Sequence, residues 1–147
     1  MGMFTTFEIS AAGMSLERMR LDVAAANLAN AHTSGTPDGV VYRPLRVVAH
    51  PTWLVSFDAT LQALTGRVPY TTPYEATVQP VDGAPRLVYE PGHPDADTKG
   101  FVAYPDVNPV SEMVELMTVT RAYEANVRAM NMAKTMALKA LEIGGDR

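Results

Sequence analysis

The stretch VSEMVELMTVTRAYEANVRAMNMAKTMALKALEI, residues 110–143, decides the fold of this chain. It contains neither proline nor glycine, and its apolar side chains recur every three or four residues, which is the spacing of one helix face. Asn108 is suited to cap such a helix and Pro109 to begin it, while Gly144 and Gly145 can end it. The sequence therefore predicts one long helix, roughly 50 Å from Val110 to Ile143 at about 1.5 Å per residue.

Two stripes follow this helix. The main stripe carries large side chains, among them Met113, Leu116, Tyr123, Val127, Met130 and Leu141. The neighbouring stripe is mostly alanine, with Asn126 and Met136 among its members, and small side chains permit close approach of a second helix. The helix is therefore predicted to have contacts on more than one side.

A second helix is predicted near the start of the chain. Its start is expected either at a capping box formed by Thr5 and Glu8 or after Gly13, because glycine inside a helix costs about 1 kcal/mol relative to alanine. Its end is expected between Ala29 and Thr33. One apolar stripe contains Ile9, Leu16, Met19 and Val23, and a stripe on nearly the opposite side contains Leu21 and Leu28, interrupted by Arg18.

A helix that is apolar on two sides is buried on both. It is either the central helix of a monomeric bundle, or it packs against its own chain on one side and a neighbouring subunit on the other. The chain offers one other long helix, which favours a neighbouring subunit. Asn27 and Asn30 lie on one side of this helix. They either form hydrogen bonds at a helix interface or are solvated near a frayed end, and alone the pattern favours solvation.

The two helices differ in length. Ile9 to Asn30 spans roughly 33 Å, so the longer helix extends past it by about three turns when the two are paired. That extension still carries apolar residues, which a soluble monomer rarely leaves bare. Methionine, which is flexible and polarizable, suits a surface that meets several partners.

Between the helices, all eleven prolines lie from Pro37 to Pro109. Short β-favouring runs occur at residues 40–42, 45–48, 53–57, 76–79, 86–89 and 100–104, with a short helical turn at 58–64 and Trp53 expected in a core. The predicted fold class is mainly α with a β-rich insert: the terminal helices pair as a coiled-coil-like hairpin, with a small antiparallel β lobe between them. The predicted parts are an N-terminal helix at 1–34, a middle lobe at 35–105 and a C-terminal helix at 106–147.

Composition excludes several classes of protein. The 147 residues are 47% hydrophobic and 19% charged with a net charge of −4, which speaks against a disordered chain and against a basic nucleic-acid surface. There is no cysteine, so disulfides and thiolate catalysis are excluded. The longest uncharged run is shorter than a membrane span, and the N-terminus lacks the features of a cleaved secretory signal.

The one cluster that could carry chemistry is at residues 93–97, where His93, Asp95 and Asp97 could bind a divalent metal. Gly92 and Pro94 instead indicate a turn, in which aspartate usually bonds its own backbone. No phosphate loop, nucleophile elbow or zinc-protease motif occurs. The sequence therefore predicts no catalytic, metal or cofactor site, and the chain is expected not to be an enzyme.

Several segments resemble one known family. ANLANAHT at 26–33 resembles the N-I-A-N-x-x-T motif of the flagellar rod and hook axial proteins. RLVYEPGHPDAD at 86–97 and GFVAYPDVN at 100–108 are more specific and resemble the proteins of the proximal rod. RAYEANV at 121–127 and AKTM at 133–136 fit the same family, whereas 39–80 matches loosely. Two departures are His32, where another asparagine is common, and Pro44, where a basic residue is common.

The resemblance implies a structural subunit of the flagellar basal-body rod, exported by the type III apparatus and assembled head-to-tail into the tube that transmits torque to the hook across the periplasm. It implies as partners other copies of the chain, the rod proteins FlgB, FlgF and FlgG, and the rod-base adaptor FliE, with neither nucleic acid nor a membrane span. The residues predicted to pack helices in the assembly are Ile9, Leu16, Met19, Leu21, Val23, Asn27, Leu28, Asn30, Met113, Leu116, Tyr123, Asn126, Val127, Met130, Met136 and Leu141. The residues carrying the family motifs are Thr33, Pro91, Gly92, His93, Pro94, Asp95, Asp97, Tyr104, Pro105 and Asn108.

A second hypothesis is a soluble helical adaptor or export chaperone that uses the same stripes for a single partner. Light scattering discriminates between the two, because an adaptor should be a well-folded monomer or dimer in dilute solution, whereas a rod subunit alone should have frayed ends.

Overall fold

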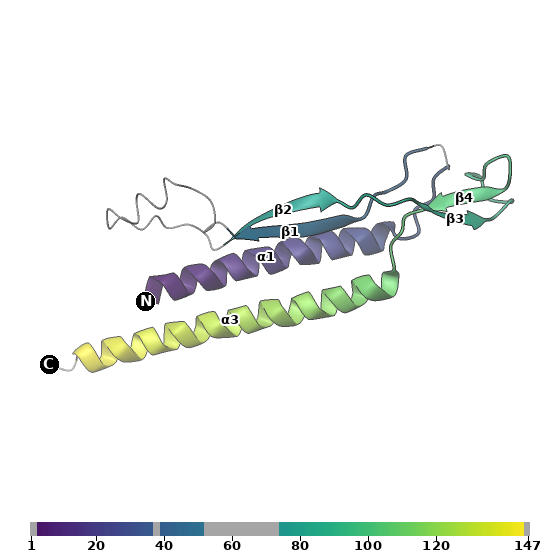
Figure 1. The fold of residues 1–147 in the computed structure, drawn as a ribbon. Helices are drawn as coiled ribbons and strands as arrows, with labels where there is room; N and C mark the ends of the chain where they lie inside the picture. The colour runs from purple at the N-terminus through teal and green to yellow at the C-terminus, as the bar shows by residue number, and fades with distance from the viewer. Residues whose placement is uncertain (1–2, 37–38, 52–73, 146–147) are drawn as a thin grey trace, which may run out of the picture. The chain divides into compact units, whose positions relative to one another are not determined.

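The computed structural model describes residues 3–36, 39–51 and 74–145. In chain order these form helix α1, strands β1 to β4 and helix α3. Figure 1 draws the two helices in the colours of the two chain ends, purple for α1 and green to yellow for α3, with the strands coming between them in sequence. This is the predicted class, a mainly helical protein with a β insert.

Helix α1 runs from Met3 to Asn30 and helix α3 from Pro109 to Gly145, 28 and 37 residues long. The predicted cap of α3 is confirmed, because the Asn108 side-chain oxygen accepts hydrogen bonds from the backbone N–H groups of Val110 at 3.0 Å and Ser111 at 3.3 Å. The predicted end of α1 is also confirmed. Both predicted starts of α1 are wrong, because the helix begins ahead of Thr5 and passes through Gly13 without a break.

The strands form two separate two-stranded sheets, where a single small sheet was expected. Strand β1, Leu45–Pro51, pairs with β2, Tyr74–Pro80. Strand β3, Arg86–Tyr89, pairs antiparallel with β4, Phe101–Tyr104, so that Tyr89 lies opposite Phe101. The expected run at 40–42 is not a strand, and its Tyr42 side chain makes a polar contact described below. The expectations for residues 53–57 and 58–64 and for Trp53 lie outside the described residues.

The chain divides into two compact units, each with segments of both helices. Unit 1 contains Met1–Arg18, Val48–Thr77 and Thr120–Arg147, and unit 2 contains Met19–Val47 and Val78–Val119. In unit 1 the helices approach each other at Gly13 and Asn126, and in unit 2 they are bridged by Asn27 and Glu112. Within each unit, the segments of the two terminal helices are therefore in contact. The three-part division at 34/35 and 105/106 stays a prediction.

The most buried side chains of unit 2 lie on α1, on β4 and at the start of α3. Ala24 and Ala31 of α1 are 2% and 1% exposed, Val102 and Ala103 of β4 are fully buried, and Val119 of α3 is 1% exposed. Pro105, directly after β4, is also among the fully buried side chains. Unit 2 thus has a small core built from short side chains, which leaves many of the larger apolar residues of the helices outside it.

Candidate functional site

Asn27 is the centre of a buried polar cluster in unit 2. This residue is 3% exposed. Its amide nitrogen donates to the carbonyl of Leu45 at 2.9 Å and to the Glu112 carboxylate at 3.4 Å. Its amide oxygen accepts from the backbone N–H of Leu45 at 2.8 Å and from the Tyr42 hydroxyl at 2.9 Å. One side chain of α1 therefore holds both α3 and the chain at the start of β1.

The expectation that Asn27 and Asn30 are both solvated fails for Asn27. Asn30 differs from it, since its amide nitrogen donates to the carbonyl of Ala26 in its own helix at 2.8 Å. Its amide oxygen accepts from the Thr33 hydroxyl at 3.4 Å. The two asparagines of the motif thus have separate roles, one between elements and one at the end of a helix.

The pKa of the Tyr42 hydroxyl is raised in this cluster. Burial raises the pKa of its hydroxyl above the ordinary 10.0, and the negative charge of Glu112 raises that pKa further. Both effects disfavour the phenolate. The hydroxyl is therefore kept protonated, which is the state that can donate to Asn27.

A hollow of about 1020 Å³ lies beside Asn27 within unit 2. Its lining includes the arginines Arg20 and Arg46 and the acidic residues Glu112 and Glu115. Side chains of both signs of charge therefore line the hollow.

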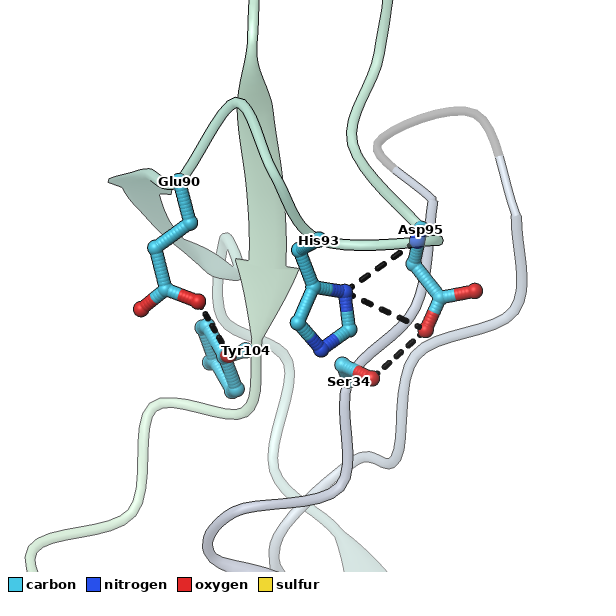
Figure 2. A network of polar contacts seen from close by, with 5 residues as sticks. All are labelled: Ser34, Glu90, His93, Asp95 and Tyr104. Atoms are coloured by element: carbon cyan, nitrogen blue, oxygen red, sulfur yellow. Dashed lines mark hydrogen bonds and ion pairs between the residues drawn. The ribbon is translucent and has the colours of Figure 1, made fainter.

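The motif segment 91–97 forms the loop between β3 and β4, and it is attached to the chain that follows α1. The Ser34 hydroxyl donates to the Asp95 carboxylate at 2.6 Å, and Gly35 and Ala103 exchange backbone hydrogen bonds at 2.9 and 3.0 Å. Figure 2 shows the His93 ring between Tyr104 and the Asp95 carboxylate. These contacts join the β3–β4 hairpin to residues 34–35, which follow α1.

The predicted turn at these residues is confirmed by its internal bonds. The His93 Nδ1 atom accepts the backbone N–H of Asp95 at 3.1 Å, and the Asp97 side-chain oxygen accepts the N–H groups of Lys99 and Phe101, each at 2.8 Å. Across 3–36, 39–51 and 74–145, no three histidine or acidic side chains are grouped so that they could hold a metal ion. The polar side chains of this loop therefore shape the turn.

Glu90 and Gly100 lie at the two ends of the β3–β4 loop, and each has a specific structural role. The Tyr104 hydroxyl donates to the Glu90 carboxylate at 3.1 Å. Burial is the first cause of a raised pKa at Tyr104, followed by the bond to Glu90. Gly100 has a φ of 84°, and a Cβ there would lie 2.9 Å from the Tyr89 ring, so this position requires glycine.

The side of α1 that is most buried carries small side chains. Ser10 in unit 1 is 7% exposed, and Ala24, Asn27 and Ala31 in unit 2 are 3% exposed or less. Gly13 lies on the same side, where a Cβ would come within 2.9 Å of the Asn126 side-chain nitrogen. Residues 10, 13, 24, 27 and 31 fit a three-and-four spacing, which is the signal that sequence reasoning missed because it followed the large apolar residues.

The large residues predicted to pack the helices lie at the margins of this contact or outside it. Leu16 is buried at 9% exposure. Half-buried are Met19, Leu21, Val23, Leu28, Asn30, Leu116, Asn126, Val127 and Met130. Exposed are Ile9, Met113, Tyr123, Met136 and Leu141. The main stripe of α3 is thus only partly covered by its own chain.

Among the motif residues, Pro105 is buried. Half-buried are His93, Asp95, Asp97 and Tyr104, while Thr33, Pro91, Gly92, Pro94 and Asn108 are exposed.

In the part of the chain that the structure describes, neither helix has a stretch long and apolar enough to cross a membrane.

Comparison with known proteins places these features in one class of protein. Residues 7–35, which contain the Asn27 motif, match the family described as flagella basal body rod protein. Residues 98–143, which contain β4 and most of α3, match the family described as flagellar basal body rod FlgEFG protein C-terminal. Both terminal helices therefore have the sequence character of structural proteins of the flagellar basal-body rod.

Relatives that match the chain almost end to end narrow the class. The flagellar basal-body rod protein FlgC of Escherichia coli O6:H1 is 40% identical over 144 residues, which is 98% of this chain and 99% of the relative. The FlgC proteins of Borreliella burgdorferi and Bacillus subtilis are each 37% identical and cover 97% and 96% of this chain, or 98% and 97% of their own lengths. The chain belongs to the FlgC family of flagellar basal-body rod proteins.

Proposed function

We propose that this chain is a non-enzymatic structural subunit that assembles head-to-tail into the axial tube of the rod, crossing the periplasm and carrying torque from motor to hook. Residues 1–34 and 106–147 form the inner wall of that tube and residues 35–105 the outer lobe. Its partners are further copies of the chain, the rod proteins FlgB, FlgF and FlgG, and the rod-base adaptor FliE. Family membership supports the structural role, and the exposed apolar surface of α3 supports assembly through contacts with neighbouring subunits.

The observation that carries the proposal is an uncovered apolar face at the start of α3. Val110, Met113, Val114 and Met117 are 68%, 52%, 58% and 59% exposed. Their spacing of three, four and seven residues puts them on one side of the helix. In the same unit, Glu112 faces the Asn27 cluster and Val119 is buried, so the exposed face is distinct from the one that contacts α1.

The other end of α3, in unit 1, is similarly exposed. Met132, Met136, Leu138, Leu141 and Ile143 are all more than half exposed, and Ile143 reaches 82%. Methionine is common on both faces, and its flexible side chain adapts to partners that differ in detail. Large apolar surfaces on a helix mark contacts with other proteins. A subunit of a tube needs such contacts on each of its flanks, and a head-to-tail contact that does not close produces an extended assembly.

The test replaces two exposed methionines of the α3 face with charged residues. Met113→Glu with Met117→Glu should give a folded protein, by circular dichroism, that is no longer incorporated into basal bodies of a strain without its own copy. The matched control is Ser111→Glu with Thr118→Glu, which adds the same charge at exposed polar positions of the same helix. The control should be incorporated normally. Incorporation of the methionine variant at the level of the unaltered protein would refute the proposed role of this face.

A further inference from the structure

Asn27 uses its whole capacity for hydrogen bonding. A side-chain amide has two N–H donors and an oxygen with two acceptor positions, and each of these four is occupied in the Asn27 cluster. Because Asn27 is almost fully buried, a bond lost here is poorly replaced by water. Aspartate has the same shape but no donor, and leucine has neither donor nor acceptor. Position 27 therefore requires an amide side chain.

The partners of Asn27 come from segments far apart in the sequence. Tyr42 and Leu45 are 15 and 18 residues away, and Glu112 is 85 residues away on the other helix. Both backbone groups of Leu45 are bound, so the amide holds the chain at the first residue of β1 in the way that a neighbouring strand would. Next to this contact, the carbonyl of Pro44 accepts the N–H of Val81 at 2.7 Å.

We propose that Asn27 is the positioning residue that couples the chain at the start of β1 to both helices, so that α1, α3 and residues 42–45 of unit 2 respond to load as one body. The load in this proposal is the torque of the proposed function, and that part of the proposal rests on the proposed function. The coupling itself is a property of the single chain, and it can be tested on purified protein.

Reversing the direction of the bond between the helices gives the sharpest test. Glu112→Gln keeps an acceptor for the Asn27 amide and should leave the coupling intact. Asn27→Asp keeps the acceptor for Leu45 and Tyr42, but it removes both donors and faces the Glu112 carboxylate with another acidic group. In the variant that carries both substitutions, the amide introduced on α3 can donate to the carboxylate introduced on α1, which restores a bond with donor and acceptor exchanged.

The readout is the hydrogen exchange of the Leu45 backbone N–H, measured by NMR in the full chain. Leaving buried groups unpaired costs about 1–3 kcal/mol, so Asn27→Asp should speed this exchange by about 5- to 150-fold. The double variant should exchange about fivefold more slowly than Asn27→Asp, the worth of about one hydrogen bond. Asn30→Asp is the matched control on the same helix, and it should leave the exchange at Leu45 unchanged because the Asn30 bonds are local.

Two outcomes overturn the proposal. One is an exchange rate at Leu45 that is unchanged in Asn27→Asp, and the other is a double variant in which Leu45 exchanges as fast as in Asn27→Asp. If Asn27→Asp does not fold, Tyr42→Phe decides, because it removes one hydroxyl from the cluster and should speed exchange at Leu45 several-fold. Tyr89→Phe, at a residue that is 64% exposed, is its control and should have no effect. A Tyr42→Phe protein that exchanges like the control also overturns the proposal. Failure of the coupling would leave incorporation of the unaltered chain into basal bodies intact, so it is distinguishable from failure of the proposed function.

Discussion

The close approach of the two helices in unit 1 can be tested by adding one methyl group. A Cβ at Gly13 would lie 2.9 Å from the Asn126 side-chain nitrogen, 3.3 Å from its Cγ and 3.4 Å from its oxygen. The first distance is too short for a stable contact, so the whole amide of Asn126 must move if Gly13 is replaced by alanine. We expect that movement to cost about 1–3 kcal/mol, as in other overpacked contacts.

An opposing effect makes the single variant hard to interpret. Alanine favours a helix over glycine by about 1 kcal/mol, so Gly13→Ala alone should change the free energy of unfolding by between about zero and 2 kcal/mol, in the destabilising direction. The informative measurement is the same substitution in an Asn126→Ala background, where the obstructing amide is gone. In that background Gly13→Ala should stabilise the protein by about 1 kcal/mol. The change in the free energy of unfolding caused by Gly13→Ala should therefore differ by about 1–3 kcal/mol between the two backgrounds.

The assay is urea denaturation followed by far-UV circular dichroism for the unaltered protein, both single variants and the double variant. Gly144→Ala is the matched control, since a Cβ at Gly144 would meet nothing within 4 Å. That variant should be neutral or slightly stabilising. If Gly13→Ala stabilises equally with and without Asn126, the helices are not in the close contact described, and the explanation of Gly13 is wrong.

Two further predictions concern unit 2. Gly100→Ala should destabilise the protein by about 2–4 kcal/mol, because its backbone is left-handed and a Cβ would contact Tyr89 and Pro91; Gly92→Ala, where a Cβ meets nothing, is the control in thermal denaturation, and equal melting temperatures would contradict the geometry. The raised pKa of Tyr42 means that the folded state holds this proton more tightly than the unfolded chain, so its contribution to stability is present below the ordinary value of 10.0 and is lost as the pH rises through the folded pKa. Tyr42→Phe should therefore lose less stability than the unaltered protein between about pH 9 and pH 11 in urea denaturation, and parallel losses in the two proteins would show that Tyr42 is not buried beside Glu112.

The local elements could largely be read from the sequence because each depends on neighbouring residues. The spacing of apolar residues and the Asn108–Pro109 pair predicted α3 close to its observed bounds, since a helix cap and a helix face are set within a few turns. The runs at 86–89 and 100–104 predicted β3 and β4 for a similar reason. The strand expected at 40–42 is absent, and the Tyr42 hydroxyl there donates to Asn27, a contact that no local sequence pattern predicts.

The inner contact surface was harder to predict. Large apolar residues such as Met113 and Leu141 attract attention in a sequence, but they are exposed in this chain, at 52% and 69%. Residues such as Ala24 and Ala31 are buried because helices and loops can approach most closely where side chains are short. A glycine inside a helix is unfavourable by itself, so Gly13 suggested a helix start until the position of Asn126 explained it.

The sequence by itself determined that the chain has two helices around a β-rich insert, where the β3–β4 hairpin turns, and that apolar helix surfaces exceed what one chain covers. Periodicity, caps and turn residues act over a few positions, so one sequence is enough to read them. Only the tertiary structure decided that Asn27, rather than Asn30, joins Leu45 to Glu112, and which side of each helix is covered. Those outcomes depend on residues up to 85 positions apart, brought together by folding, and a linear pattern does not record them.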